Sequence, residues 1–386
     1  MIEKSKLPHV GTTIFTVMSA LAATHKAINL SQGFPDFEPD KDLLEICGRK
    51  MREGPHQYAP MAGSINLRNQ VCQLIKKKYG ILLNPESEIT ITAGATQALF
   101  TAITALVHSG EEVIYFEPAY DCYEPAIRLQ NAVPVPVRLQ QHTFRPDWNE
   151  VESKINSQTR MIIINNPHNP CSSVLTKDDM KALDEICQRH SGIFVLSDEV
   201  YEHICFHEQG HQSVWMFPIL QKRSIQVSSF GKVLHATGWK IGYCAAGDNI
   251  MKEIRKVHQF NVFCVNHPLQ EAIAEYMSLR RDFHRIEEMY RKKRDFFTEK
   301  IQSLPFHLYP CDGSYFLLAG YSEICSLSDQ EFCVRMTQEA GVAAIPLSAF
   351  YHDGKDDRLI RFCFAKKEST LEEAAIKIRR WIERLL

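Results

Sequence analysis

The chain has 386 residues, enough for one large domain and a smaller one. Lys and Arg number 44 against 46 Asp and Glu, so the net charge of −2 gives no electrostatic basis for binding nucleic acid or an anionic membrane. The 12 cysteines are scattered without any C-x-x-C pair, and no stretch approaches 18 consecutive apolar residues. These features predict a cytoplasmic enzyme with reduced thiols, without a disulfide framework, a zinc ribbon or a membrane span.

Between about residues 88 and 246, short β-rich runs alternate with helical stretches. The runs, which we predict to be strands, are 88–92, 112–116, 161–164, 193–197, 224–228 and 241–246. The stretches 96–108 and 177–190 have apolar residues spaced near 3.6. Alternation of this kind predicts right-handed βαβ units and a mostly parallel sheet.

The pattern changes after about residue 280. Apolar residues on one face predict a long helix from 283 to 304, and strand-like pieces follow it at 315–319, 342–346 and 359–364. An amphipathic helix from 371 to 385 closes the chain. This second half is typical of a separate α+β unit.

Polar residues follow the predicted strands, at the sheet edge where parallel sheets bind ligands. Small residues at 93–97 open a helix, which suits either an anion site or a tight turn. Asp198 ends a buried strand, so it serves either as a helix cap or as the counter-ion of a cation. Lys232 follows another strand beside small residues and is a candidate amine nucleophile with a lowered pKa.

Three histidines form the one metal candidate in the sequence. His203, His207 and His211 are spaced i, i+4, i+8 and could share one helix face. The segment 208–210 (Glu-Gln-Gly) would break that helix, and no H-E-x-x-H motif accompanies it. We therefore expect solvent-facing loop histidines and no metal.

Pyridoxal phosphate is a cofactor that needs all of these groups together. It requires a phosphate-binding turn, an acid that faces its ring nitrogen, hydroxyl and amide donors, and a reactive lysine. The chain resembles the class I/II aminotransferases of fold type I from residue 11 to residue 368, and the subgroup it resembles contains bacterial methionine aminotransferases and kynurenine–glutamine aminotransferases. The motifs that carry this resemblance are 31–37 (SQGFPDF), 57–60 (QYAP) and 117–123 (EPAYDCY).

The resemblance implies an α/β fold with a mostly parallel central sheet in a large domain and a smaller α+β domain. We expect an N-terminal arm and part of the small domain in residues 1–40, the large cofactor-binding domain in 41–282 and the small domain in 283–386. It also implies a homodimer with shared active sites.

The same resemblance assigns roles around the cofactor. Lys232 forms the Schiff base and moves the proton at the substrate Cα, while Asp198 keeps the ring nitrogen protonated. Asn169 and Tyr201 donate to the phenolic oxygen, and Tyr120 stacks on the ring. The predicted phosphate ligands are Ala95, Thr96, Ser229, Lys240 and, from the neighbouring subunit, Tyr58.

The substrate side of the site is assigned in the same way. Gly33, Asn169 and Arg361 match the clamp on the substrate α-carboxylate, with Arg361 bidentate. The resemblance further predicts a cis peptide bond between Asn169 and Pro170. Many class I enzymes carry Arg at the position of Lys240, whereas the kynurenine-like subgroup carries Lys.

The resulting hypothesis is transfer of the amino group of methionine, or of an aromatic or neutral amino acid, to a 2-oxo acid. Cysteine-S-conjugate β-elimination uses the same cofactor and remains the alternative; a cofactor-binding regulator is disfavoured because no basic DNA-binding arm is present. In members of this family that prefer dicarboxylates, an arginine of the partner subunit holds the distal carboxylate, and the resemblance places it near residues 260–266. Residues 257–279 of this chain contain no Arg or Lys, but they offer Phe260 and Phe263, and the N-terminal part offers Ile14 and Phe15. An apolar pocket favours methionine over aspartate.

Overall fold

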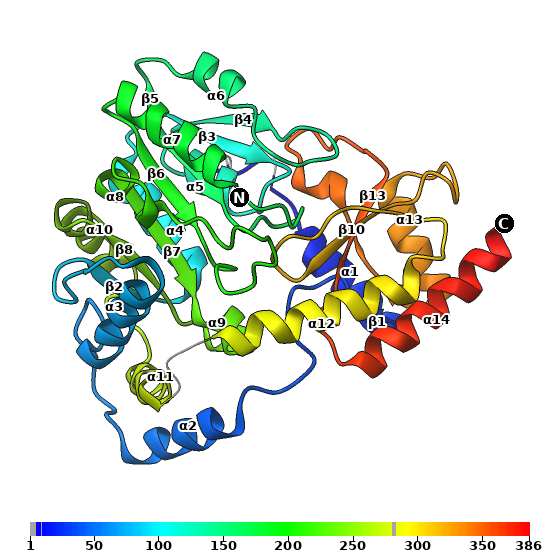
Figure 1. Ribbon diagram of the computed structural model, residues 1–386, viewed down its shortest axis with the longest axis horizontal. Helices are drawn as coiled ribbons and strands as arrows, with labels where there is room; N and C mark the ends of the chain where they lie inside the picture. Colours follow the sequence, from blue (N-terminus) through cyan, green and yellow to red (C-terminus); the bar gives the residue numbers. More distant parts are fainter. Residues whose placement is uncertain (1–4, 9, 280–282) are drawn as a thin grey trace.

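A seven-stranded sheet forms the centre of the larger half of the molecule in the computed structural model, which describes residues 5–8, 10–279 and 283–386 (Figure 1). The strand order is β2 (Ile89–Thr92), β8 (Gly242–Ala246), β7 (Ser224–Ser229), β6 (Phe194–Asp198), β5 (Thr159–Asn165), β3 (Glu112–Glu117) and β4 (Val133–Arg138). The strands from β7 to β4 are parallel, and β8 is antiparallel to both of its neighbours. The expected mostly parallel sheet is confirmed.

One strand of this sheet was not predicted. The segment Val133–Arg138 reads VPVPVR, and its two prolines argue against a strand in the middle of a sheet. It forms β4 at the sheet edge, where it pairs with β3 on one side only. Proline is tolerated there because an edge strand has backbone N–H groups that need no ladder partner.

Helices cover both faces of the sheet, which explains why its strands are apolar throughout. Met161 and Ile163 of β5 pack in a core with α4 (Gly94–Leu106) and α10 (Asp248–Asn261). Ile162 and Ile164 face the opposite core, which includes α7 (Lys177–Arg189). Successive side chains of one strand therefore enter two different cores.

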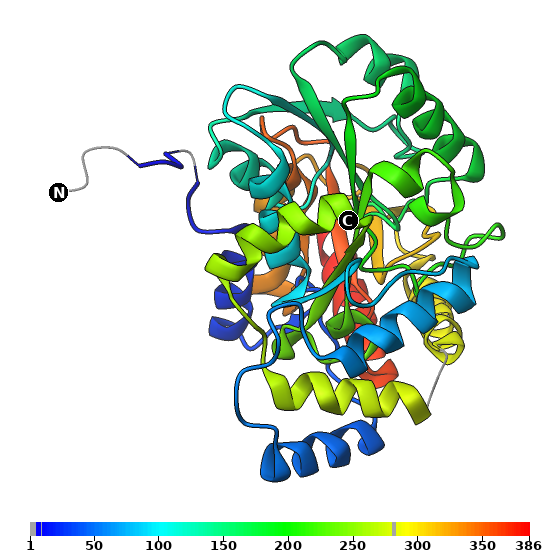
Figure 2. The same ribbon diagram turned by 90° about the vertical axis from the view of Figure 1, so that its left-hand side faces the viewer.

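The same cover continues toward the β2 edge of the sheet. There α3 (Ile65–Tyr79) packs near β2, and α2 (Lys41–Glu53) lies beside α11 (His267–Leu279), as Figure 2 shows. The remaining helices of this half are short: α5 (Tyr123–Arg128), α6 (Trp148–Lys154), α8 (Leu220–Arg223) and α9 (Phe230–Val233).

A smaller antiparallel sheet forms the second half of the molecule. Its order is β12 (Ile345–Pro346), β13 (Leu359–Cys363), β10 (Phe316–Gly320) and β9 (His307–Leu308). The long helix α12 (His284–Ile301) runs from the large sheet toward this one, where it lies beside α14 (Glu368–Leu385) (Figure 1). A further helix, α13 (Asp329–Arg335), packs near β12.

The N-terminal segment belongs structurally with this second half. Helix α1 (Ile14–Thr24) leads into β1 (Ile28–Asn29), which pairs in parallel with β11 (Val342–Ala343). The single strand predicted at 342–346 is therefore wrong: the segment divides into β11, which pairs with β1, and β12, which pairs with β13. Pairing with a distant N-terminal segment is not visible in local sequence.

The two halves meet at the carboxyl ends of the parallel strands. Beyond β3, the Ala119 N–H donates to Phe350 O at 2.7 Å, and beyond β6 the Ser314 N–H donates to Ile204 O at 2.8 Å. Ligands bind at this edge of parallel sheets, so the junction is the place to look for chemistry. No helix among the described residues is both long enough and apolar enough to cross a membrane.

The first residue of β8 must be glycine for the sheet to approach α4. A Cβ on Gly242 would lie 2.6 Å from Ser228 O and 3.0 Å from Ala95 N, both backbone atoms that cannot move aside easily. We expect Gly242→Ala to lower the free energy of unfolding in urea by about 1–3 kcal/mol, the usual cost of overpacking. Gly192→Ala is the control, because a Cβ there meets nothing within 4 Å; equal losses in the two variants would contradict this packing constraint.

Candidate active site

A pocket of about 130 Å³ lies at the carboxyl ends of β5, β6 and β7, beside the N-terminus of α4. Nine of the residues predicted for the site line it: Ala95, Thr96, Tyr120, Asn169, Asp198, Tyr201, Ser229, Lys232 and Lys240. The Asn169–Pro170 peptide bond is cis, as predicted. The sequence segments that supply these residues are up to 145 positions apart, between Ala95 and Lys240, and the parallel sheet brings them together.

Lys232 lies on α9, the short helix that directly follows β7. Its Nζ donates to the Tyr315 hydroxyl at 3.0 Å and lies 3.4 Å from Gly33 O. Loss of hydration in this pocket disfavours the ammonium form and lowers the pKa of Lys232 to about 8. An amine with this pKa is neutral in roughly a tenth to a fifth of molecules near physiological pH, far more than an ordinary lysine, which makes it a usable nucleophile and base.

Asp198 is the last residue of β6 and is almost completely buried. Its Oδ2 accepts from the Tyr123 hydroxyl at 2.7 Å, and its Oδ1 accepts from the Val200 N–H at 3.4 Å. Burial raises the pKa of Asp198 to about 6. No helix of the described chain begins directly after Asp198, so Asp198 does not cap one.

The start of α4 forms a cradle with positive potential. The first N–H groups of this 13-residue helix have no acceptors within the helix, and Ala95 and Thr96 from its first turn line the pocket. Gly94 has φ +77, and a Cβ on it would lie 3.2 Å from Lys240 Cε. A helix N-terminus beside an ammonium group is suited to a phosphate.

Arg361 forms a second positive centre outside this pocket. It lies on β13 and is almost fully buried; its Nη1 donates to Asn169 Oδ1 at 2.5 Å and its Nη2 donates to Ser31 O at 2.9 Å. Its guanidinium carbon lies 3.8 Å from the centroid of the Phe316 ring. Its Nε has no hydrogen-bond partner among the described residues, and burial lowers the pKa of Arg361 to about 10, so the group stays charged at neutral pH.

No carboxylate in the described part of the chain forms an ion pair with Arg361, although Asp121 lies near enough to favour its charge. A buried guanidinium without an ion pair is costly, which suits a site that receives an anion. Position 33, next to the Phe316 ring, favours glycine for a steric reason: a Cβ there would lie 2.8 Å from Phe316 Cζ. Asn169 joins the two centres, since it lines the pocket and accepts from Arg361.

Tyr58 is not part of the pocket of its own chain. Its side chain is 81% exposed and packs edge-on against Phe263, with ring centroids 5.4 Å apart. Phe260 is also exposed, at 86%. These exposed aromatic rings lie where the resemblance places a subunit contact.

Sequence reasoning missed three residues that the structure places next to the predicted ones. Tyr123 donates to Asp198, Ser31 accepts from Arg361 through its carbonyl, and Tyr315 contacts Lys232. Tyr123 and Ser31 lie inside motifs that carry the resemblance, which is a usable signal. Tyr315 precedes a strand of the second sheet, and local sequence gives no indication that it reaches the lysine.

The histidines at 203, 207 and 211 do not share a helix face, because no helix spans them. The expectation that all three face solvent is wrong for His203, whose side chain is only 9% exposed, and for His211. His211 is buried beside Glu199 and Glu202, and one candidate ligand atom from each of these three residues lies within 4.8 Å of the others. The Lys78 ammonium lies 3.5 Å from Glu202 Oε2, and Tyr79 donates to the same oxygen at 2.7 Å. A lysine thus supplies the positive charge that this buried cluster needs.

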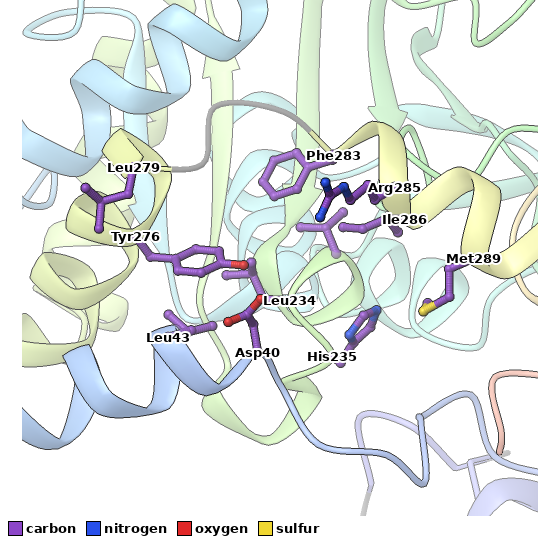
Figure 3. A pocket seen from close by; sticks show the side chains of 11 residues that line it. Asp40, Leu43, Leu234, His235, Tyr276, Leu279, Phe283, Arg285, Ile286 and Met289 are labelled. Carbon is purple, nitrogen blue, oxygen red and sulfur yellow. The ribbon is translucent and has the colours of Figure 1, made fainter.

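A larger pocket, of about 560 Å³, is shown in Figure 3. Its walls come from α2, α11 and α12 and from Val233, Leu234 and His235, which directly follow Lys232 in the sequence. His235 Nε2 is buried without a hydrogen-bond partner among the described residues. None of the predicted site residues lines this second pocket.

Comparison with known proteins assigns the chain to a family. The model of the family "Aminotransferase class I and II" matches residues 25–378. The chain belongs to this family. The aminotransferase is 50% identical over 380 residues to methionine aminotransferase of Escherichia coli, a match that covers 98% of each chain. It is 30% identical to kynurenine–oxoglutarate transaminase 1 of Rattus norvegicus, over 99% of this chain and 98% of that enzyme.

Solved structures show the same relationship. An Escherichia coli protein described as having a methionine aminotransferase function superposes with a TM-score of 0.96 at 49% identity, covering 98% of this chain and all of that one. N-succinyldiaminopimelate aminotransferase of Mycobacterium tuberculosis superposes with a TM-score of 0.93 at 33% identity, covering 97% and 98% of the two chains. The aminotransferase therefore has the fold of these enzymes along its whole length.

The lowered pKa of Lys232 can be measured on the cofactor-free protein. We expect competitive acetylation of Lys232 to show a midpoint near pH 8, because burial disfavours the ammonium, whereas an ordinary lysine titrates near about 10.4. The reference is Lys181, whose side chain is 55% exposed, and both peptides are quantified in the same digests by mass spectrometry. Identical midpoints for Lys232 and Lys181 would show that the pocket does not desolvate the amine.

Proposed function

We propose that this aminotransferase moves the amino group of methionine, or of an aromatic or other neutral amino acid, to a 2-oxo acid with the help of pyridoxal phosphate. The observation that carries the proposal is one pocket that contains a lysine of lowered pKa, a buried carboxylate and a helix N-terminus. The 50% identity to a methionine aminotransferase supports the choice of donor.

The residues present fit pyridoxal phosphate. The N-terminus of α4 with Ser229 and Lys240 suits its phosphate, and the Lys232 amine suits covalent attachment to its aldehyde. Asn169 and Tyr201 line the same pocket and can donate to its phenolic oxygen. When bound, the cofactor supplies an electron sink for the carbanion formed at the substrate Cα.

Lys232 carries the proton in this proposal. In the cofactor-free chain its Nζ has a pKa of about 8, and the free amine would act as the base at the substrate Cα. Such a value matches general-base chemistry near neutral pH, because the neutral form is accessible and the protonated form can return the proton.

Asp198 is assigned the role of keeping the cofactor's ring nitrogen protonated. Its pKa of about 6 applies to a carboxylate without a cationic neighbour in contact, and an opposite charge placed against it favours the ionised form. The Tyr123 hydroxyl donates to Asp198 Oδ2 and holds the carboxylate in one orientation. An ionised Asp198 and a protonated ring nitrogen would stabilise each other in a dry site.

Arg361 is assigned to the substrate α-carboxylate. The guanidinium is already oriented by Asn169, by the Ser31 carbonyl and by the Phe316 ring, so binding requires little reorganisation. The aromatic rings of Phe15 and Phe350 lie 5.5 and 5.1 Å from its central carbon and exclude water on their side. An α-carboxylate would then place Cα close to the pocket that contains Lys232.

We also propose that the enzyme works as a cytoplasmic homodimer with shared active sites. The exposed side chains of Tyr58 and Phe260 support a subunit contact, with Tyr58 reaching the partner's phosphate. All twelve cysteines lie in the described part of the chain and are free thiols, which suits a reducing compartment.

The two sheets support a division of the chain into domains. We propose an N-terminal arm and part of the small domain in 1–40, since β1 pairs with β11, and a large domain that begins with α2 at Lys41. The expected boundary lies between residues 282 and 283, and residue 282 is outside the described residues. We propose that the small domain begins there, just before helix α12, which starts at His284.

Cysteine-S-conjugate β-elimination needs the same lysine and the same cofactor, and nothing in the described residues or the comparisons favours it. Formation of pyruvate and ammonia without any 2-oxo acid acceptor would identify that reaction. Transamination requires the acceptor and forms a new amino acid.

The donor preference provides the test of the proposed function. Methionine gains about 0.8 kcal/mol for each buried methylene, whereas aspartate must desolvate a second carboxylate, and residues 257–279 contain no Lys or Arg to pair with it. We expect kcat/KM for methionine to exceed that for aspartate by at least about tenfold, which corresponds to about 1.4 kcal/mol. Lys232→Ala protein, purified in parallel, gives the background rate; a higher kcat/KM for aspartate would refute the assigned pocket.

A further inference from the structure

The hydroxyl of Tyr315 lies between the reactive lysine and the N-terminal segment. Its oxygen is 3.0 Å from Lys232 Nζ and 2.5 Å from Gly33 O, and the side chain is completely buried. Tyr315 directly precedes β10 of the small sheet, whereas Lys232 follows β7 of the large sheet. One hydroxyl therefore joins three segments that are far apart in sequence.

Hydrogen-bond accounting fixes the direction of these contacts. A tyrosine hydroxyl has one proton, and a backbone carbonyl can only accept, so the proton of Tyr315 points to Gly33 O. The hydroxyl oxygen then accepts from Lys232 Nζ. Tyr315 thus acts as an acceptor for the lysine while its own orientation is held by Gly33.

The same accounting orients the lone pair of the neutral amine. A neutral Lys232 has two N–H bonds, and its two nearby acceptors are Tyr315 Oη at 3.0 Å and Gly33 O at 3.4 Å. With both hydrogens on that side, the lone pair points away from Tyr315 and Gly33. This lone pair is the part of the amine that a base must direct at a substrate proton.

The Tyr315 ring cannot easily turn out of this position. It packs edge-on against Tyr201 and Phe316, with centroids 5.1 and 4.9 Å apart, and it is tilted against Tyr290 at 5.6 Å. Tyr290 is equally buried, but its hydroxyl has no hydrogen-bond partner in the part of the chain that the structure describes. The two tyrosines share an environment and differ in their contact with the lysine.

We propose that Tyr315 is a positioning residue that directs the lone pair of free Lys232 toward the substrate Cα. This inference rests on the proposed function of Lys232, and it goes beyond it by naming the group that orients the amine. Charged and titratable side chains around Lys232 come from several elements: Asp198 on β6, Tyr201 after it, Lys240 before β8, and Arg361 and Cys363 on β13. Tyr315 differs from these side chains because its hydroxyl is hydrogen-bonded to Nζ.

The test compares Tyr315→Phe with Tyr290→Phe. Each change removes one buried hydroxyl and keeps the ring, so the loss of packing is matched. For Tyr315→Phe we expect kcat with methionine to fall by about tenfold to hundredfold while KM changes by less than about threefold, since the substrate contacts remain but the base is misoriented. We expect Tyr290→Phe to retain wild-type values.

A second readout uses the cofactor-free proteins. Loss of the hydroxyl removes an acceptor that favours the ammonium form, so the acetylation midpoint of Lys232 should move to lower pH in Tyr315→Phe and stay unchanged in Tyr290→Phe. A structural effect alone would not move this midpoint selectively. The free energy of unfolding in urea is measured for both variants. If both lose stability, the difference in kcat and in the Lys232 midpoint between them still isolates the effect of the Tyr315 hydroxyl.

The outcomes separate the two claims. If both variants match in kcat and in the Lys232 midpoint, the positioning role of Tyr315 is wrong although the enzyme still transaminates. If wild-type protein loaded with pyridoxal phosphate transaminates no amino acid, the proposed function is wrong whatever the midpoints show. A midpoint shift together with a selective loss of kcat in Tyr315→Phe supports the inference.

Discussion

The chemistry of this site depends on one constraint: the amine of Lys232 is shielded from water where the two halves of the molecule meet. A lysine normally remains charged and solvated, and lowering its pKa to about 8 requires the surroundings to disfavour the ammonium. The large sheet supplies the position of Lys232, at the end of β7, but it does not enclose the amine by itself. Tyr315 from the small sheet and Gly33 from the N-terminal segment complete the enclosure. The environment of the lysine therefore depends on contacts between the two halves of the molecule.

The charges of the site alternate in sign between the elements that carry them. The cradle at the start of α4 is positive, Asp198 is the buried carboxylate of the pocket, and Arg361 is positive again on β13. Arg361 Nε has no hydrogen-bond partner among the described residues, and an unpaired buried polar group is costly. In the proposed function, cofactor and substrate would supply the opposite charges to a pattern that the fold has already built, which is how preorganised sites gain their strength.

Much of this arrangement could be predicted from sequence, because it follows from strand order and local motifs. Each strand predicted between residues 88 and 246 is present, and the ends of β5, β6 and β7 place Asn169, Asp198 and Lys232 in one pocket as expected. What could not be predicted depends on contacts between segments distant in sequence. The edge position that allows prolines in β4, the division of 342–346 into β11 and β12, and the contact of Tyr315 with Lys232 are all of this kind.

The most direct test of the account is to ask which lysine carries the cofactor. The chain loaded with pyridoxal phosphate is reduced with sodium borohydride, digested and analysed by peptide mass spectrometry. The account predicts a stoichiometric phosphopyridoxyl label on the peptide that contains Lys232, and no label at other lysines such as Lys240, which lines the same pocket. A label at Lys240 or elsewhere, or no label in a protein that transaminates, would contradict the assignment of Lys232 on which the account rests.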